Sequence, residues 1–147
     1  MSTSDVPTIL DALGARLREA AEGVRFLNKS EAPFSPVLLR PGREVASPPL
    51  DAAEVRRRFD IPHGVPVAER ALDAFFRYGV EDVDPACPRE RAAVPAVRRL
   101  RETVRELAPD ARAFRVGDGR VVRYLIVGHA RAVPGALAGV ETIGYEP

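Results

Sequence analysis

Three residue types are scarce in this sequence, which has one cysteine, one lysine and no tryptophan. Because Cys87 is the single cysteine, the chain cannot form an intrachain disulfide or a metal site built from several thiolates. A reducing compartment suits such a chain, and we expect a cytoplasmic protein. No apolar run approaches the ~20 residues that a membrane-spanning helix needs, and the first residues lack the pattern of a secretory signal. We therefore expect no contact with a membrane.

An excess of charge of either sign is also missing. The sequence has 22 basic and 21 acidic residues, for a formal net charge of +1, so no overall field attracts nucleic acid. The basic run at residues 56–58 occupies nearly one helical turn around Val55 and Phe59, and no aromatic platform for stacked bases accompanies it. We interpret this run as a solvated helix face and expect no direct contact with nucleic acid.

Motifs for catalysis are absent from the sequence. It contains no GxSxG or HExxH, and the glycines at 117 and 119 lie between two strand patterns, which indicates a hairpin turn and not a phosphate loop. His63 and His129 lie in separate loops, so an enzyme that used either one with Asp60 would require them to converge in one cleft. The sequence predicts a protein that is not an enzyme and has no cofactor and no bound metal.

Two long helices are predicted from apolar residues that recur every three or four positions. The first spans residues 4–22, with Ser4 or Thr8 as a cap and Gly23 as its stop. The second centres on residues 93–107, and Pro95 must lie in its first turn or kink it, because an interior proline removes a backbone donor.

Shorter helical segments are predicted between the two long ones. Asp51 is placed to cap a short helix over residues 52–59. A short extended piece at 65–68 precedes Asp73, which we expect to cap a turn of helix that places Phe75 and Phe76 in the core. Residues 79–88 form an irregular acidic loop.

The strand predictions complete the fold. Residues 24–27 are expected to pair with residues 36–39, and three later strands at 113–116, 121–127 and 136–145 form an antiparallel meander. With 147 residues and 46% hydrophobic content, the chain suits one core. We therefore predict a single domain over residues 1–147, of α+β class, with a mainly antiparallel sheet covered by helices.

The loop between the first two predicted strands combines polar residues with prolines at 33 and 36. Prolines that hold a polar loop in one shape lower the ordering cost of binding, so this loop is typical of a protein-recognition surface. In the alternative reading the loop is only a connection, with Phe34 in the core. An exposed Phe34 favours recognition through the whole loop, whereas a buried Phe34 leaves the polar residues as candidates.

Three separated blocks of the sequence resemble one known family. They are TILDALGARLREAAEGVRFLNKSEAPF, LDAFFR, and AFRVGDGRVVRYLIVG followed by LAGVETIGYEP. In this order they resemble the nuclease A inhibitor family, whose members inhibit a sugar-non-specific, metal-dependent nuclease. The resemblance implies a three-layer α-β-α sandwich of the pathogenesis-related-protein-like shape. It also implies a partner nuclease whose active site is blocked by surface loops and the chain end.

The sequence departs from the family at both contact positions that approach the nuclease metal. Lys29 stands where the family has an acidic side chain, and Pro147 ends the chain where the family has a hydroxyl residue. A lysine repels a divalent cation. Glu31 and Glu146 are the neighbouring residues that offer a carboxylate for the same role, while the alternative for Glu31 is simple solvation.

The function predicted from these observations is non-enzymatic binding of a partner protein, namely a metal-dependent nuclease. The alternative is a small-molecule-binding or regulatory domain, which requires an apolar pocket within the sandwich. The predicted partner-binding residues are Lys29, Ser30, Glu31, Pro33 and Phe34 of the first loop, Glu81, Asp82 and Asp84 of the acidic loop, and Tyr145, Glu146 and Pro147 at the chain end.

Overall fold

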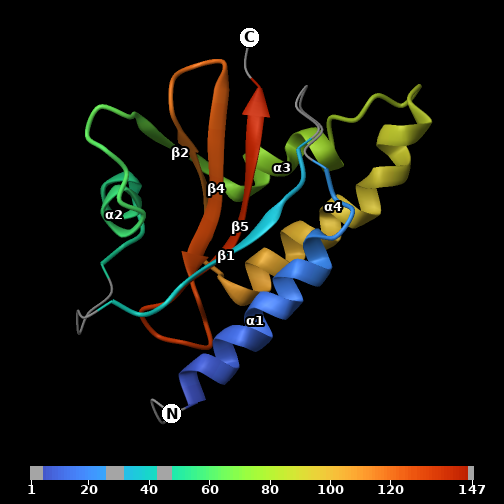
Figure 1. The fold of residues 1–147 in the computed structure, drawn as a ribbon. Helices are drawn as coiled ribbons and strands as arrows, with labels where there is room; N and C mark the ends of the chain where they lie inside the picture. Colours follow the sequence, from blue (N-terminus) through green and yellow to red (C-terminus); the bar gives the residue numbers. More distant parts are fainter. Residues whose placement is uncertain (1–4, 26–31, 43–47, 146–147) are drawn as a thin grey trace.

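The structure, a computed structural model, describes residues 5–25, 32–42 and 48–145. Within these ranges the chain forms four helices and one five-stranded sheet (Figure 1). The helices are α1 (Val6–Ala21), α2 (Ala52–Arg58), α3 (Leu72–Val80) and α4 (Pro88–Leu107). The strands are β1 (Ser35–Leu39), β2 (Val67–Ala71), β3 (Arg112–Val116), β4 (Val121–His129) and β5 (Leu137–Tyr145). Among the described residues, no helix is both long enough and apolar enough to cross a membrane.

Helix α1 follows its predicted pattern. Its buried side chains Leu10, Leu13, Leu17 and Ala21 lie three or four positions apart, which gives one face toward the core. The helix stops at Gly23 as expected, and this residue has a φ of 75°, a value that favours glycine. The predicted cap is not borne out at Thr8, which lies inside the helix, and Ser4 lies outside the described residues.

Helix α4 is longer than the sequence pattern predicts. It begins at Pro88, so Pro95 lies inside the helix and not in its first turn. The buried residues Val97, Leu100 and Val104 all follow the proline, and their packing against the core offsets the hydrogen bond that Pro95 cannot donate. Of the two predicted places for Pro95, the first turn was wrong, because the helix begins in a segment before Pro95 that carries no apolar stripe of its own.

The sheet has the strand order β1-β5-β4-β3-β2, and every pair is antiparallel. The predicted hairpin joins β3 to β4, with Gly117 at a φ of 112°. Of the predicted pairing of residues 24–27 with 36–39, residues 26 and 27 lie outside the described residues. Arg25 forms an isolated bridge to Pro33 and not to a residue of 36–39, so the predicted register is wrong at this position. Strand β1 pairs with β5, from Ser35 opposite Glu141 to Leu39 opposite Leu137.

Three smaller predictions concern the segment between β1 and α4. Asp51 caps α2 as expected, since its Oδ1 accepts a hydrogen bond of 2.9 Å from the backbone N–H of Glu54. Asp73 does not cap α3; it lies in the first turn, and the cap position is taken by Ala71 at the end of β2. Phe75 and Phe76 are in the core, each 2% exposed.

Each face of the sheet has its own apolar cluster. On the first face, α1, α3 and α4 pack against alternate residues of the central strands, among them Val122, Tyr124 and Ile126. On the second face, Val55 of α2 packs with Leu125 and Val127. Figure 1 shows α1 and α4 on one side of the sheet and α2 on the other. The predicted α+β class with a helix-covered antiparallel sheet is confirmed.

Candidate functional site

Three segments were predicted to contact a partner: the first loop, the acidic loop and the chain end. The described residues in or next to these segments all lie at one end of the molecule. In Figure 1 this is the upper end, where residues 32–33 enter β1, residues 81–87 connect α3 to α4, and β5 finishes at Tyr145. Five of the predicted contact residues lie outside the described residues: Lys29, Ser30, Glu31, Glu146 and Pro147. The geometry of the site is therefore described from the residues that lead into these segments, namely residues 32–33, which we call the first stem, residues 81–87 and the end of β5.

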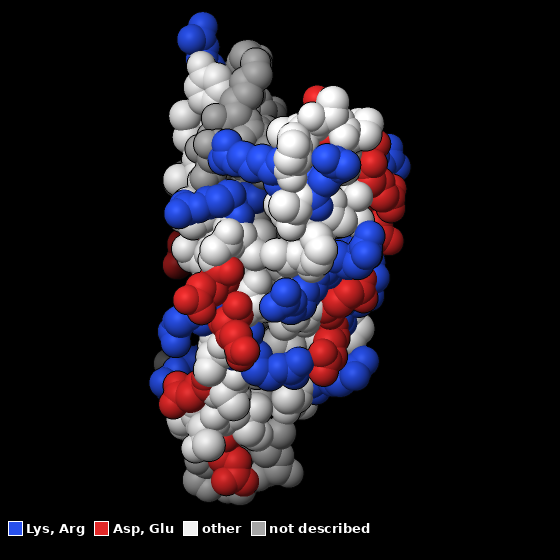
Figure 2. Space-filling view, turned by 90° about the vertical axis from the view of Figure 1, so that its right-hand side faces the viewer, with Lys and Arg blue, Asp and Glu red and all other residues white. Residues whose placement is uncertain are grey.

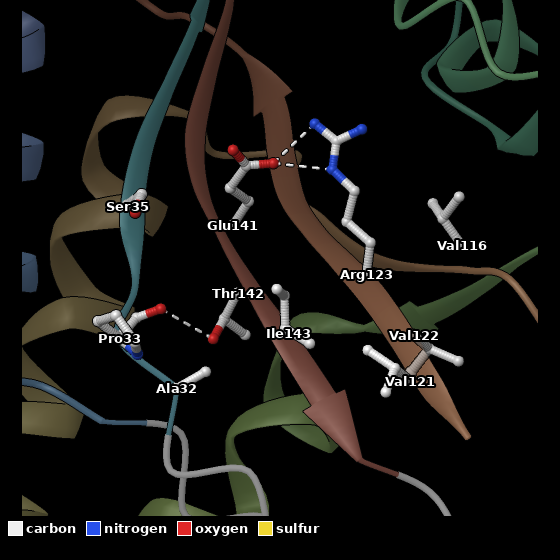
Figure 3. Close-up of a pocket in the computed structure, with 10 residues that line it drawn as sticks. All are labelled: Ala32, Pro33, Ser35, Val116, Val121, Val122, Arg123, Glu141, Thr142 and Ile143. Atoms are coloured by element: carbon white, nitrogen blue, oxygen red, sulfur yellow. Dashed lines mark hydrogen bonds and ion pairs between the residues drawn. The ribbon is translucent and has the colours of Figure 1, made fainter. Parts of the chain in front are cut away.

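A partly buried hydrogen bond joins residues 32–33, which lead out of the first loop, to the last strand. The hydroxyl of Thr142, which is 4% exposed, donates to the backbone carbonyl of Pro33 over 3.0 Å (Figure 3). The β1–β5 ladder begins two residues later, at Ser35 opposite Glu141. Since Pro33 is exposed, water can replace this donor, and the net contribution of such a hydrogen bond is about 0.5–1.5 kcal/mol. The exit of the first loop is therefore fixed to the strand that leads to the chain end.

Aromatic packing joins the same stem to α3. Phe34 is 6% exposed, and its ring lies 6.2 Å from that of Phe76. Phe76 in turn makes an edge contact with Phe75, at 5.0 Å between ring centres. Because Phe34 is buried, it is unavailable for direct contact with a partner, and the polar residues of the first loop remain as candidates.

The acidic connection between α3 and α4 is an ordered turn with exposed carboxylates. The backbone N–H groups of Glu81 and Asp82 donate to the carbonyl of Arg77 over 2.9 and 2.7 Å, which closes the end of α3. The Oδ1 atom of Asp84 accepts from the N–H of Ala86 over 2.9 Å. All three acidic residues are exposed. The segment thus presents negative charge at the upper end of the molecule on a backbone held by its own hydrogen bonds.

The two histidines lie at opposite ends of the sheet. His63 is three residues before Pro66, whose carbonyl accepts from Gly117 in the β3–β4 hairpin, while His129 ends β4 and contacts Asp110 through Nδ1 over 2.6 Å. The length of β4 separates these ends by about 26 Å. In the described part of the chain, no group of three or more His, Cys, Asp or Glu residues is arranged to hold a metal. The alternative of an enzyme built on converging histidines is not supported.

A groove of about 570 Å³ lies on the second face of the sheet, beside the first stem. It opens onto the surface and is not enclosed within the sandwich, so it differs from the internal pocket that the small-molecule alternative requires. Figure 3 shows it between the start of β1, the start of β4 and the end of β5. Its walls include Pro33, Val121 and Ile143. Strand alternation places Val121 and Ile143 on one face, but no sequence signal reveals that α2 leaves them uncovered.

Charges of both signs alternate over the helical side of the molecule (Figure 2). Arg16 on α1 pairs with Glu106 on α4 over 2.9 Å, and Arg105 contacts both Glu102 and Asp73. The Arg16 guanidinium, through its hydrogen bond and its charge, lowers the pKa of the Glu106 carboxyl below its usual value of 4.5. Among the described residues on this side, charges of the two signs are mixed, unlike the single-sign surface that attracts nucleic acid.

Comparison with known protein families gives a match over most of the chain. The family described as "Nuclease A inhibitor-like protein" matches residues 11–146, which is nearly the whole chain. A search of curated proteins gave no significant match.

Proposed function

Because the chain belongs to the nuclease A inhibitor-like family, we propose that it is a non-enzymatic protein that binds a metal-dependent nuclease and blocks its active site. The contact surface is the upper end of the molecule in Figure 1. It comprises the first loop with Lys29, Ser30, Glu31 and Pro33, the acidic turn with Glu81, Asp82 and Asp84, and the chain end with Tyr145, Glu146 and Pro147.

The observation that carries this proposal is the hydrogen bond from Thr142 to Pro33. It attaches residues 32–33 to β5, so the described residues that lead to the first loop and to the chain end lie next to each other. The packing of Phe34 on Phe76 attaches the first stem to the helix that leads into the acidic turn. Segments held in place before binding lose less conformational freedom when they meet a partner.

The charges at this end suit a nuclease cleft. A cleft that binds phosphate groups and a divalent metal is electropositive, and carboxylates on a partner are complementary to it. The acidic turn supplies three exposed carboxylates. Lys29 has the wrong sign for a contact with the metal, so we assign that contact to the carboxylate of Glu31 or Glu146, with Glu31 as the first to test.

The test is an inhibition and binding assay with a purified sugar-non-specific, Mg²⁺-dependent nuclease. We expect the wild-type chain to bind the nuclease and suppress its activity, and Glu31→Lys to weaken both by at least about tenfold through charge repulsion. Asp11→Lys is the matched control, because it makes the same change of charge sign at an exposed site on α1, the helix that begins near the opposite end of the molecule.

Two results would contradict the proposal. One is a wild-type chain that neither binds nor inhibits any nuclease of this class. The other is equal weakening by Glu31→Lys and Asp11→Lys, which would mean that net charge matters and the first loop does not.

A further inference from the structure

The two large apolar side chains that are most exposed in the described part of the chain lie together in the groove on the second face. Val121 is 63% exposed and Ile143 is 50% exposed. Ile143 lies directly opposite Arg123 in the β4–β5 ladder, and Val121 is two residues before Arg123, so all three share one face. Val116 and Pro33 add apolar walls on either side. Exposed apolar residues that cluster in this way mark an interaction site more often than isolated ones do.

One border of the groove is a fixed ion pair. The Arg123 guanidinium donates to Glu141 from Nε over 2.8 Å and from Nη2 over 2.6 Å (Figure 3). The ring of Phe59, at the end of α2, lies 6.0 Å from the Arg123 guanidinium carbon. Because the two charges are held against each other, the border is polar but has no net charge. Such a groove suits an uncharged apolar group, and a charged one would gain no partner here.

The groove is continuous with the proposed contact surface. Its walls include Ala32 and Pro33, which directly follow the first loop, and Ile143, which is two residues before Tyr145. A protein that covers the first loop and the chain end therefore also reaches this groove. An apolar anchor in a pocket with a polar border is the arrangement that contributes most affinity in protein interfaces.

We propose that the groove formed by Val121, Ile143 and Pro33 receives an apolar side chain from the rim of the same nuclease, beside the contacts made in its active site. This inference rests on the proposed function and adds a second, apolar contact to it. The acidic turn and the first loop recognise charge, whereas the groove recognises shape and apolar surface. Binding to the nuclease therefore has one component that salt screens and one that it does not.

The test measures the affinity of purified variants for the nuclease used above, together with their melting temperatures. We expect Ile143→Glu to weaken binding about ten- to hundredfold, because it removes the burial of one large aliphatic side chain and places a charge in a neutral groove. Ile143→Leu is expected to bind like wild type. Ala68→Glu, at an exposed position of the edge strand β2, is the matched control and should not change affinity.

The outcomes separate this inference from the function on which it rests. If wild type binds the nuclease and Ile143→Glu binds equally well, the groove is not a contact and the inference fails, while the proposed function stands. If wild type does not bind the nuclease, both fail. If Ile143→Glu instead abolishes self-association of the wild-type chain seen on size-exclusion chromatography, the occupant is a second copy of the chain, and the inference is overturned.

Discussion

The two faces of the sheet differ in how far helices cover them. On the face beneath α1, α3 and α4, the β4 residues Val122, Tyr124 and Ile126 are all at most 3% exposed. On the other face of the same strand, Leu125 is fully buried and Val121 is 63% exposed. One strand thus contributes to a complete core on one side and to a half-covered surface on the other.

Helix length accounts for this difference. The 20 residues of α4 span about 30 Å, which matches the nine-residue strands β4 and β5. The seven residues of α2 span only about 10 Å, and they cover the part of the sheet near Leu125. The open part that remains is next to the first loop and the chain end. The short helix therefore leaves uncovered the region in which we place binding.

The largest expected difference in the free energy of unfolding is between substitutions at two residues on the second face of β4. Leu125→Ala is predicted to lower the free energy of unfolding by about 2–5 kcal/mol, because it leaves a cavity in a closed cluster. Val121→Ala is predicted to change it by no more than about 0.5 kcal/mol, because most of the side chain is already in water. Urea denaturation of both variants measures the difference. Similar losses for the two would contradict the division of this face into a covered and an open part.

A smaller effect on stability is expected from weakening α2, the helix that covers part of the second face. Asp51→Ala removes the side-chain acceptor of the Glu54 N–H at the start of α2. It is predicted to lower the free energy of unfolding by about 1 kcal/mol, as measured by urea denaturation. Asp11→Ala, an exposed change inside α1, is the control and should lie closer to wild type. An equal loss in both variants would show that the cap does not hold α2 on the sheet.

The smallest effect is expected on the fully covered side, at the pair of Arg16 and Glu106. The pKa of Glu106 is lowered in the folded state, so its charge stabilises the fold at pH values above its unfolded pKa. That contribution is lost as the pH falls through the lowered folded pKa. Glu106→Gln is therefore predicted to melt slightly below wild type at pH 7 and together with wild type near pH 2. Melting curves across this range provide the measurement.

A Glu106→Gln variant that differs from wild type equally at both pH values would contradict the assignment of the effect to charge. The pair is well exposed, at 48% and 57%, so solvent screens it and the difference is small. A small difference at pH 7 would sharpen the comparison of the two faces. It would mean that the helix-covered face is held by the apolar residues beneath the helices, and that its surface ion pairs contribute little.

Local patterns in the sequence determined much of the fold. The apolar stripes of α1 and α4, the Asp51 cap and the hairpin at Gly117 were all predicted, because each depends on residues close together in the chain. The contact surface was predicted less completely. Residues of the first loop, the acidic turn and the chain end were selected from loop composition and family resemblance, but no local signal shows that their stems meet at one end of the molecule.

Contacts between distant residues decided the rest. Strand β1 pairs with β5, some hundred positions away in the chain, and no local pattern in the sequence identifies that partner. Phe34 is buried since Phe76 of α3 lies next to it.

The sequence by itself determined which residues alternate between the faces of each strand, because that period of two is a property of the backbone. Only the tertiary structure decided which of those faces are covered, since burial depends on where helices from other parts of the chain come to rest.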